Sequence, residues 1–194
     1  MTDGSAGYPS AYLAETERIL KAMAPQIQER LPQMRETLEQ ARRGGRTIFI
    51  MGNGGSASTA SHFANDLNKY TIREGDPRFR AVSLADNVAT MLAWANDQSY
   101  DDIFVEQLKN HLSPGDVLIG ISGSGNSRNC LKALAYAREK GATNITWSGF
   151  GGGKMPELAD QSLVIPSHDM TQCENVHLIL EHLLVSWIKG EKSP

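Results

Sequence analysis

The stretch that decides the fold is TIFIMGNGGSA, residues 47–57, in which a short apolar run meets a glycine-rich turn. Thr47–Met51 is mostly apolar and β-branched, which is typical of a strand buried in a parallel sheet. The glycines allow a sharp turn, and a helix that begins after them points free N–H groups and its positive dipole end at the turn. Residues 47–57 therefore predict a strand, an anion-binding turn and a helix.

A second turn of the same kind, SGSGNS at residues 122–127, follows the apolar run Val117–Ile121 and precedes a helical pattern. Its serine hydroxyls and asparagine surround a backbone nest that can bind phosphate without lysine. Two other interpretations stay open. Both turns fit ordinary serine-capped turns, and the first matches the dinucleotide pattern G-x-G-x-x-A, although Asp86 lies too far along the chain for its acidic residue. The dense set of hydroxyls favours phosphate binding.

The wider pattern is one of apolar runs that alternate with helical stretches. Four further strands are expected, at residues 79–84, 117–121, 144–147 and 162–165. Helical periodicity lies between and after the strands, at residues 58–68, 87–95, 103–111, 127–140 and 173–189. This order predicts a doubly wound α/β domain, a five-stranded parallel sheet flanked by helices. Ligands of such sheets bind beyond the carboxyl ends of the strands, where both turns lie.

Residues 1–43 form a separate N-terminal segment in this interpretation. Apolar side chains recur there at steps of three, four or seven residues, which predicts one or two amphipathic helices. Pro25 and Pro32 are expected to break or kink them, because each removes a backbone donor. The segment carries more apolar surface than one small domain needs. We therefore expect residues 1–43 to pack against other subunits and residues 44–194 to form the α/β domain that carries both turns.

Composition limits the classes of function. The 194 residues carry 19 Lys and Arg against 22 Asp and Glu, a formal net charge of −3 without long charged blocks, so no nucleic-acid partner is expected. No apolar run approaches the roughly 18 residues of a membrane span, so no membrane partner is expected either. Cys130 and Cys173 form no CxxC pair, which suits a reducing compartment. We expect a soluble, cytoplasmic protein.

Several motifs, in order, resemble the sugar isomerase (SIS) domain family. The similarity runs from about Thr47 to Leu184 and includes both turns. It also includes His62-Phe63-Ala64, Asn96-Asp97, residues 115–122 and 137–141, and a last helix with His177 and His182. The resemblance implies a five-stranded parallel sheet and homotetramers whose active sites lie between subunits.

The resemblance also implies which residues bind a sugar phosphate. The expected substrate-binding positions are Asn53, Gly54, Gly55, Ser56, Asp66, Asn96, Asp97, Ser122, Gly123, Ser124, Ser127 and Glu174. Gly123 departs from the pattern, because the family commonly has threonine there. The exchange removes one hydroxyl from the turn and leaves the backbone donor.

Two pairs of residues form the expected proton-transfer and metal site. His62 and Asp66 are four residues apart on one helix and share a face, and Glu174 and His182 are eight apart on the last helix and project roughly together. Two imidazoles and two carboxylates suit a divalent cation such as zinc. In this family the four positions are histidine, glutamate, glutamine and histidine. The family glutamate is the base and the last histidine the acid, which implies these roles for Asp66 and His182.

Two of these positions depart from the family pattern. Asp66 keeps the carboxylate of the glutamate but is shorter by one carbon–carbon bond, about 1.5 Å. Glu174 replaces the glutamine and adds a negative charge, which favours metal binding or, if no metal is present, raises the pKa of a neighbouring carboxylate. We therefore expect a functional site with a different phosphosugar preference or a changed metal dependence.

The leading hypothesis is an aldose–ketose isomerase that acts on a sugar phosphate, with sedoheptulose 7-phosphate as the expected substrate. The alternative is a non-catalytic SIS module that binds a phosphosugar or a protein such as a replication initiator. Isomerisation through an enediol requires one base and one acid. Asp66 and His182 supply both and favour the enzyme, whereas His177 is expected to pack locally.

Overall fold

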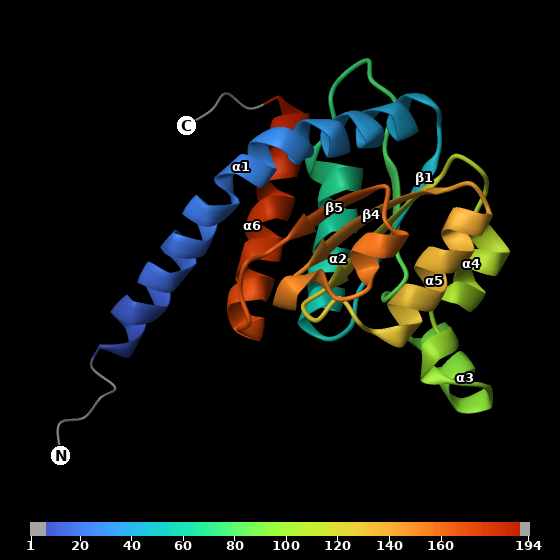
Figure 1. Cartoon of the computed structure of the whole chain (residues 1–194). Coiled ribbons are helices and arrows are strands. Elements are labelled where there is room, and N and C mark those ends of the chain that lie inside the picture. Colours follow the sequence, from blue (N-terminus) through green and yellow to red (C-terminus); the bar gives the residue numbers. More distant parts are fainter. Residues whose placement is uncertain (1–6, 191–194) are drawn as a thin grey trace.

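The five expected strands form one parallel sheet in the order β2-β1-β3-β4-β5. The computed structural model describes residues 7–190 (Figure 1). The strands are β1 (Thr47–Met51), β2 (Arg80–Ser83), β3 (Val117–Ser122), β4 (Thr143–Ser148) and β5 (Gln161–Val164). The order reverses direction at β1, so the expectation of a doubly wound sheet is confirmed.

Helices cover both faces of this sheet. They are α1 (Tyr8–Arg43), α2 (Gly55–Asn65), α3 (Val88–Asp97), α4 (Val105–His111), α5 (Arg128–Glu139) and α6 (Met170–Lys189). Alternate residues of β1 point to opposite faces, so Ile48 and Ile50 pack with α1, α2 and α6, whereas Phe49 and Met51 pack with α4 and α5. Two apolar cores thus hold the sheet between two helical layers.

The first helix continues through both of its prolines. Figure 1 shows that α1 changes direction along its length, but it remains one helix from Tyr8 to Arg43. Pro25 and Pro32 are both exposed, so the carbonyl groups that lose a donor there face solvent. The helix ends where residues 1–43 were expected to end, yet Leu31 and Leu38 belong to the core under the sheet. The separate oligomerisation role of this segment stays a prediction, and residues 1–6 lie outside the described part.

Amide side chains cap the backbone at both edges of the sheet. On edge strand β5, Gln26 of α1 donates to the Val164 carbonyl (3.2 Å) and accepts from its N–H (3.3 Å). On edge strand β2, Asn68 does the same for Ala81, at 2.7 and 2.9 Å. Each pair of bonds occupies edge groups that would otherwise be free to pair with another strand.

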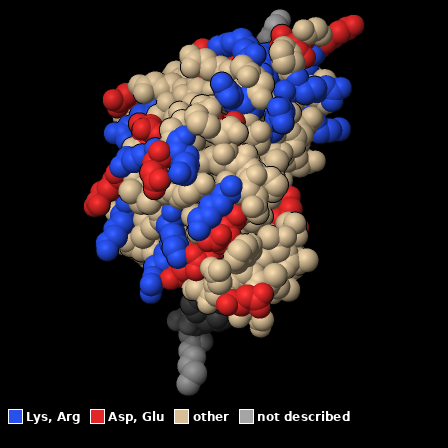
Figure 2. All heavy atoms as spheres, turned by 90° about the vertical axis from the view of Figure 1, so that its right-hand side faces the viewer, with Lys and Arg blue, Asp and Glu red and all other residues tan. Residues whose placement is uncertain are grey.

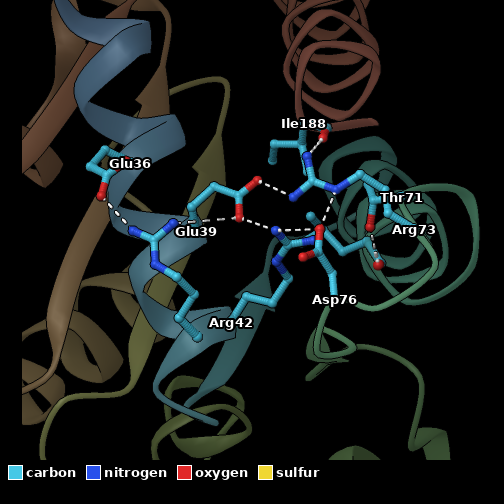
Figure 3. A network of polar contacts seen from close by, with 9 residues as sticks. Glu36, Glu39, Arg42, Thr71, Arg73, Asp76 and Ile188 are labelled. Atoms are coloured by element: carbon cyan, nitrogen blue, oxygen red, sulfur yellow. Dashed lines mark hydrogen bonds and ion pairs between the residues drawn. The ribbon is translucent and has the colours of Figure 1, made fainter. Parts of the chain in front are cut away.

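A buried polar network anchors the end of α1 (Figure 3). Glu39 and Arg42 are only 3% and 4% exposed and form an ion pair of 2.5 Å. Arg73, from the loop before β2, lies 3.2 Å from Glu39 and donates to the Ile188 carbonyl of α6 at 2.7 Å. Asp76 contacts both arginines. One carboxylate thereby joins α1, the loop before β2 and the end of α6.

This network makes a prediction about stability. Glu39→Ala removes the carboxylate and leaves Arg42 buried without its main partner, so we expect a loss of about 3–5 kcal/mol of unfolding free energy. Glu36→Ala is the matched control, because Glu36 pairs with Arg43 on the exposed side of the same helix and should change little. Urea denaturation of both variants measures the difference. Equal losses in the two variants would show that the buried network is not the anchor.

Three features relate to the expectations about membrane spans, charge and cysteines. Between residues 7 and 190, no helix combines the length and apolar character that crossing a membrane requires. Figure 2 shows acidic and basic side chains intermingled over the face that carries α4 and α5. Cys130 and Cys173 are buried and free, and burial raises the pKa of the Cys130 thiol to about 12. Such a thiol is unreactive at neutral pH.

Candidate functional site

The first glycine-rich turn opens α2 as expected. Gly54 has φ +55°, a value that favours glycine, and α2 begins at Gly55 without a side-chain cap. Asn53 exchanges hydrogen bonds with Asn129 of α5, at 3.0 and 2.8 Å, and accepts one from the Tyr100 hydroxyl at 2.9 Å. The start of α2 therefore has N–H groups without a side-chain cap, and Asn53 ties this turn to the helix that follows the second turn.

The second turn gathers its hydroxyls at the start of α5. Ser122 and Ser127 lie 3.2 Å apart through their Oγ atoms, and the Gly125 N–H donates to the Ser122 Oγ at 3.2 Å. The N–H groups of Lys154 and Met155 donate to the Gly125 carbonyl at 3.0 and 3.1 Å. The loop after β4 therefore stabilises the turn through these two backbone hydrogen bonds.

The Met170 side chain occupies the space beside Gly123, the position where the family commonly has threonine. A Cβ atom at Gly123 would lie 2.2 Å from the Met170 Sδ and 3.0 Å from its Cε. The first residue of α6 thus fills the volume that a side chain at Gly123 would need. With glycine at position 123, the Met170 thioether lies beside the second turn where a threonine hydroxyl would otherwise lie.

The second turn yields a prediction about glycine. Gly125 has φ +62°, and a Cβ there would lie 1.9 Å from the Gly152 carbonyl oxygen, so Gly125→Ala should displace the turn and weaken binding of a sugar phosphate at least tenfold. Gly151→Ala is the control, because Gly151 has φ +77° but open space around it. Calorimetric titration with a sugar phosphate measures both. Equal weakening by both variants would assign the effect to backbone strain alone.

Two helices bring together the residues of the proton-transfer site. His62 comes from α2, Asp66 opens the one-turn π-helix Asp66–Tyr70 that follows it, and His182 comes from α6. The His62 Nε2 lies 3.5 Å from the Asp66 Oδ2 and 3.5 Å from the His182 Nε2. The two imidazoles are 42% and 50% exposed, so the site opens to the surface of the single chain.

A fourth residue, Glu181, joins this group. Its carboxylate lies 3.3 Å from the His182 Nε2, and one ligand atom from each of the four residues lies within 4.8 Å of the others. Burial and the neighbouring Asp66 carboxylate raise the pKa of Glu181 to about 8. A bound cation favours the charged form instead. Two imidazoles and two carboxylates are a donor set that fits a divalent ion.

Glu174 lies elsewhere along the same helix. Its carboxylate fills the space beside Gly55, where an added Cβ would be 2.5 Å from the Oε1 atom. It therefore sits at the first turn, and the four-residue group in the described part of the chain does not include it. Asn96 and Asp97 hydrogen-bond to each other (2.7 Å) at the exposed end of α3, which Figure 1 places away from α6.

The core-facing side of α6 explains why sequence reasoning missed Glu181. Ile179 and Leu183, which helical periodicity alone would also place toward the core, are 37% and 39% exposed. The buried face contains Val176, His177, Leu180, Glu181, Leu184, Val185 and Ile188. His177 packs inside this face, and burial lowers its pKa to about 4. The signal available in the sequence was Glu181 itself, a glutamate that lies between apolar residues of the last helix.

A separate groove on the surface is lined by none of the predicted substrate-binding or metal-binding residues. A groove of about 620 Å³ runs beside edge strand β2, and its lining includes Ser61, Asn65 and Gln107. Ser61 hydrogen-bonds there to Asp86. Because no residue of either glycine-rich turn lines it, this groove is not the predicted phosphate-binding site.

Comparison with known proteins establishes the class. The model of the SIS domain family matches residues 11–149, and the chain belongs to this family. Its relatives include proteins named phosphoheptose isomerase. The one from Aliarcobacter butzleri is 39% identical over 184 residues, 94% of this chain and 95% of the relative. The one from Rhodospirillum rubrum is 42% identical over 148 residues, 76% and 78% of the two chains.

A solved structure agrees with these relatives. The phosphoheptose isomerase of Neisseria gonorrhoeae superposes with a TM-score of 0.89 at 29% identity, over 96% of this chain and 99% of that one. The expectation of the SIS fold is therefore confirmed over nearly the whole length of the chain.

Proposed function

We propose that this protein is a phosphoheptose isomerase, an aldose–ketose isomerase that converts sedoheptulose 7-phosphate to D-glycero-D-manno-heptose 7-phosphate. The observation that carries the proposal is the meeting of Asp66 and His182 beside two anion-binding turns. The base and the acid come from different helices, and the start of α2 has no side-chain cap, which leaves N–H groups for an anion. The names of the relatives support the same substrate.

The two turns hold the phosphate in this proposal. The backbone of Asn53, Gly54, Gly55 and Ser56 lies at the start of α2, and Ser122, Gly123, Ser124 and Ser127 lie at the start of α5. Helix ends and hydroxyls thus bind the anion, with no need of a basic cluster. Asn96 and Asp97 remain expected substrate contacts, and their exposed place on α3 suits a site that a neighbouring subunit completes.

Asp66 and His182 move the protons. Asp66 removes the proton from the carbon beside the carbonyl and returns it to the other carbon, while His182 protonates the carbonyl oxygen and accepts the proton of the neighbouring hydroxyl. The base therefore ends each turnover as a carboxylate and the acid as it began. The His62 Nε2 lies 3.5 Å from a side-chain atom of each group.

A divalent ion, which we propose to be zinc, fits the same residues. His62, Asp66 and His182 would hold it, with a further carboxylate as the fourth ligand. When bound, such an ion polarises the carbonyl and the enediolate oxygens.

The proposed assembly is a homotetramer with active sites between subunits. Apolar side chains are exposed on two helices of the single chain, with Val88 and Leu92 of α3 at 55% and 63% and Trp187 of α6 at 39%. Burying such surface favours association. We further propose a cytoplasmic location, in which the two free thiols stay reduced.

Turnover is the direct test of this function. Metal-replete protein incubated with sedoheptulose 7-phosphate should give the aldose product, followed by NMR. Asp66→Asn and His182→Ala should lower kcat at least 100-fold, because each removes a proton-transfer group. His111→Ala is the control, since His111 lies at the exposed end of α4 and has no place in the site. The proposal fails if no ketose phosphate is turned over, and the module would then be a non-catalytic binder.

A further inference from the structure

The Glu181 carboxylate is buried beside a second carboxylate, that of Asp66. Its side chain is fully buried, and its polar neighbours are the His182 Nε2 at 3.3 Å and Asp66, with which it can share a proton. No Lys or Arg between residues 7 and 190 forms an ion pair with it. Burying a charged carboxylate is unfavourable, so such a group either keeps its proton or binds a cation.

The surroundings of this carboxylate determine what can offset that cost. His182 lies 3.3 Å away, and the Asp66 carboxylate lies within the same 4.8 Å group. Two ionised carboxylates side by side repel each other, and without a metal they can share one proton. A divalent ion placed among the four groups relieves the same repulsion, because its two positive charges balance the two negative charges.

Glu174 has a different place and a different neighbour. It lies eight residues before His182, about 12 Å along the helix axis, and its carboxylate rests against Gly55 at the start of α2. His62 is seven residues further along α2, about 10 Å from Gly55. Because α2 and α6 pack side by side, Glu174 lies level with the phosphate turn, whereas Glu181 lies level with His62 and Asp66.

We infer that Glu181, and not Glu174, completes the metal site with His62, Asp66 and His182. This inference rests on the proposed function, since it concerns the metal of the same site. The chain keeps a four-residue site although Asp66 is shorter than the family glutamate, because a second carboxylate enters from the buried side of α6. Glu174 is then left at the first turn, where it contacts Gly55 instead of the metal.

Metal affinity of the full-length protein tests the inference apart from activity. Competition with a chromophoric chelator should show that Glu181→Gln weakens zinc binding at least 100-fold, because the loss of mere supporting groups around a metal already costs 10–100-fold. Glu174→Gln is the matched control and should stay within about fivefold, the scale of a screened nearby charge. With Co²⁺ in place of zinc, only Glu181→Gln should shift the visible d–d bands, which report ligand identity.

The inference is overturned if Glu181→Gln keeps the affinity and the Co²⁺ spectrum, or if Glu174→Gln produces the loss. Absence of any metal binding by the unaltered protein also overturns it, while the isomerase proposal is decided separately by turnover. If Glu181→Gln does not fold, Glu181→Asp and Glu174→Asp form the second pair. The first should then lower the affinity and shift the spectrum, and the second should do neither.

Discussion

The packing of α2 against α6 is the contact on which the site depends. The Phe63 ring of α2 stacks on Trp147 of β4, with centroids 5.4 Å apart and an angle of 16° between the rings. This contact fixes the rotation of α2 about its axis. His62, which precedes Phe63, and Asp66, which follows it by three residues, are then directed to the α6 side, where Val176 and Leu180 complete the same core. Apolar packing thus sets the geometry of the polar site.

The protein treats two buried carboxylates in opposite ways. Glu39 lies between Arg42 and Arg73, so its charge is neutralised within the chain and joins three segments of the fold. Glu181 lies at a comparable depth on α6 but faces another carboxylate and no guanidinium. The first arrangement serves stability, whereas the second suits a carboxyl group that either keeps a proton or binds a cation.

The local features of the fold and site could be predicted from sequence. Apolar runs bounded by glycine predict the strands, and the four-residue spacing predicts that His62 and Asp66 share a face. Features that join distant segments could not be predicted from spacing. The Asn53–Asn129 pair spans 76 residues and the caps on β5 span 138, and nothing local distinguishes Gln26 from any surface amide. The rotation of α6 could not be predicted either, because both sides of that helix carry leucine and isoleucine.

Crystals grown with zinc and measured on both sides of its absorption edge test the central claim most directly. The account predicts one strong anomalous peak per chain, within bonding distance of His62, Asp66, Glu181 and His182, at the junction of α2 and α6. A peak that Glu174 coordinates while Glu181 stays apart, or no peak at this junction, would contradict the account.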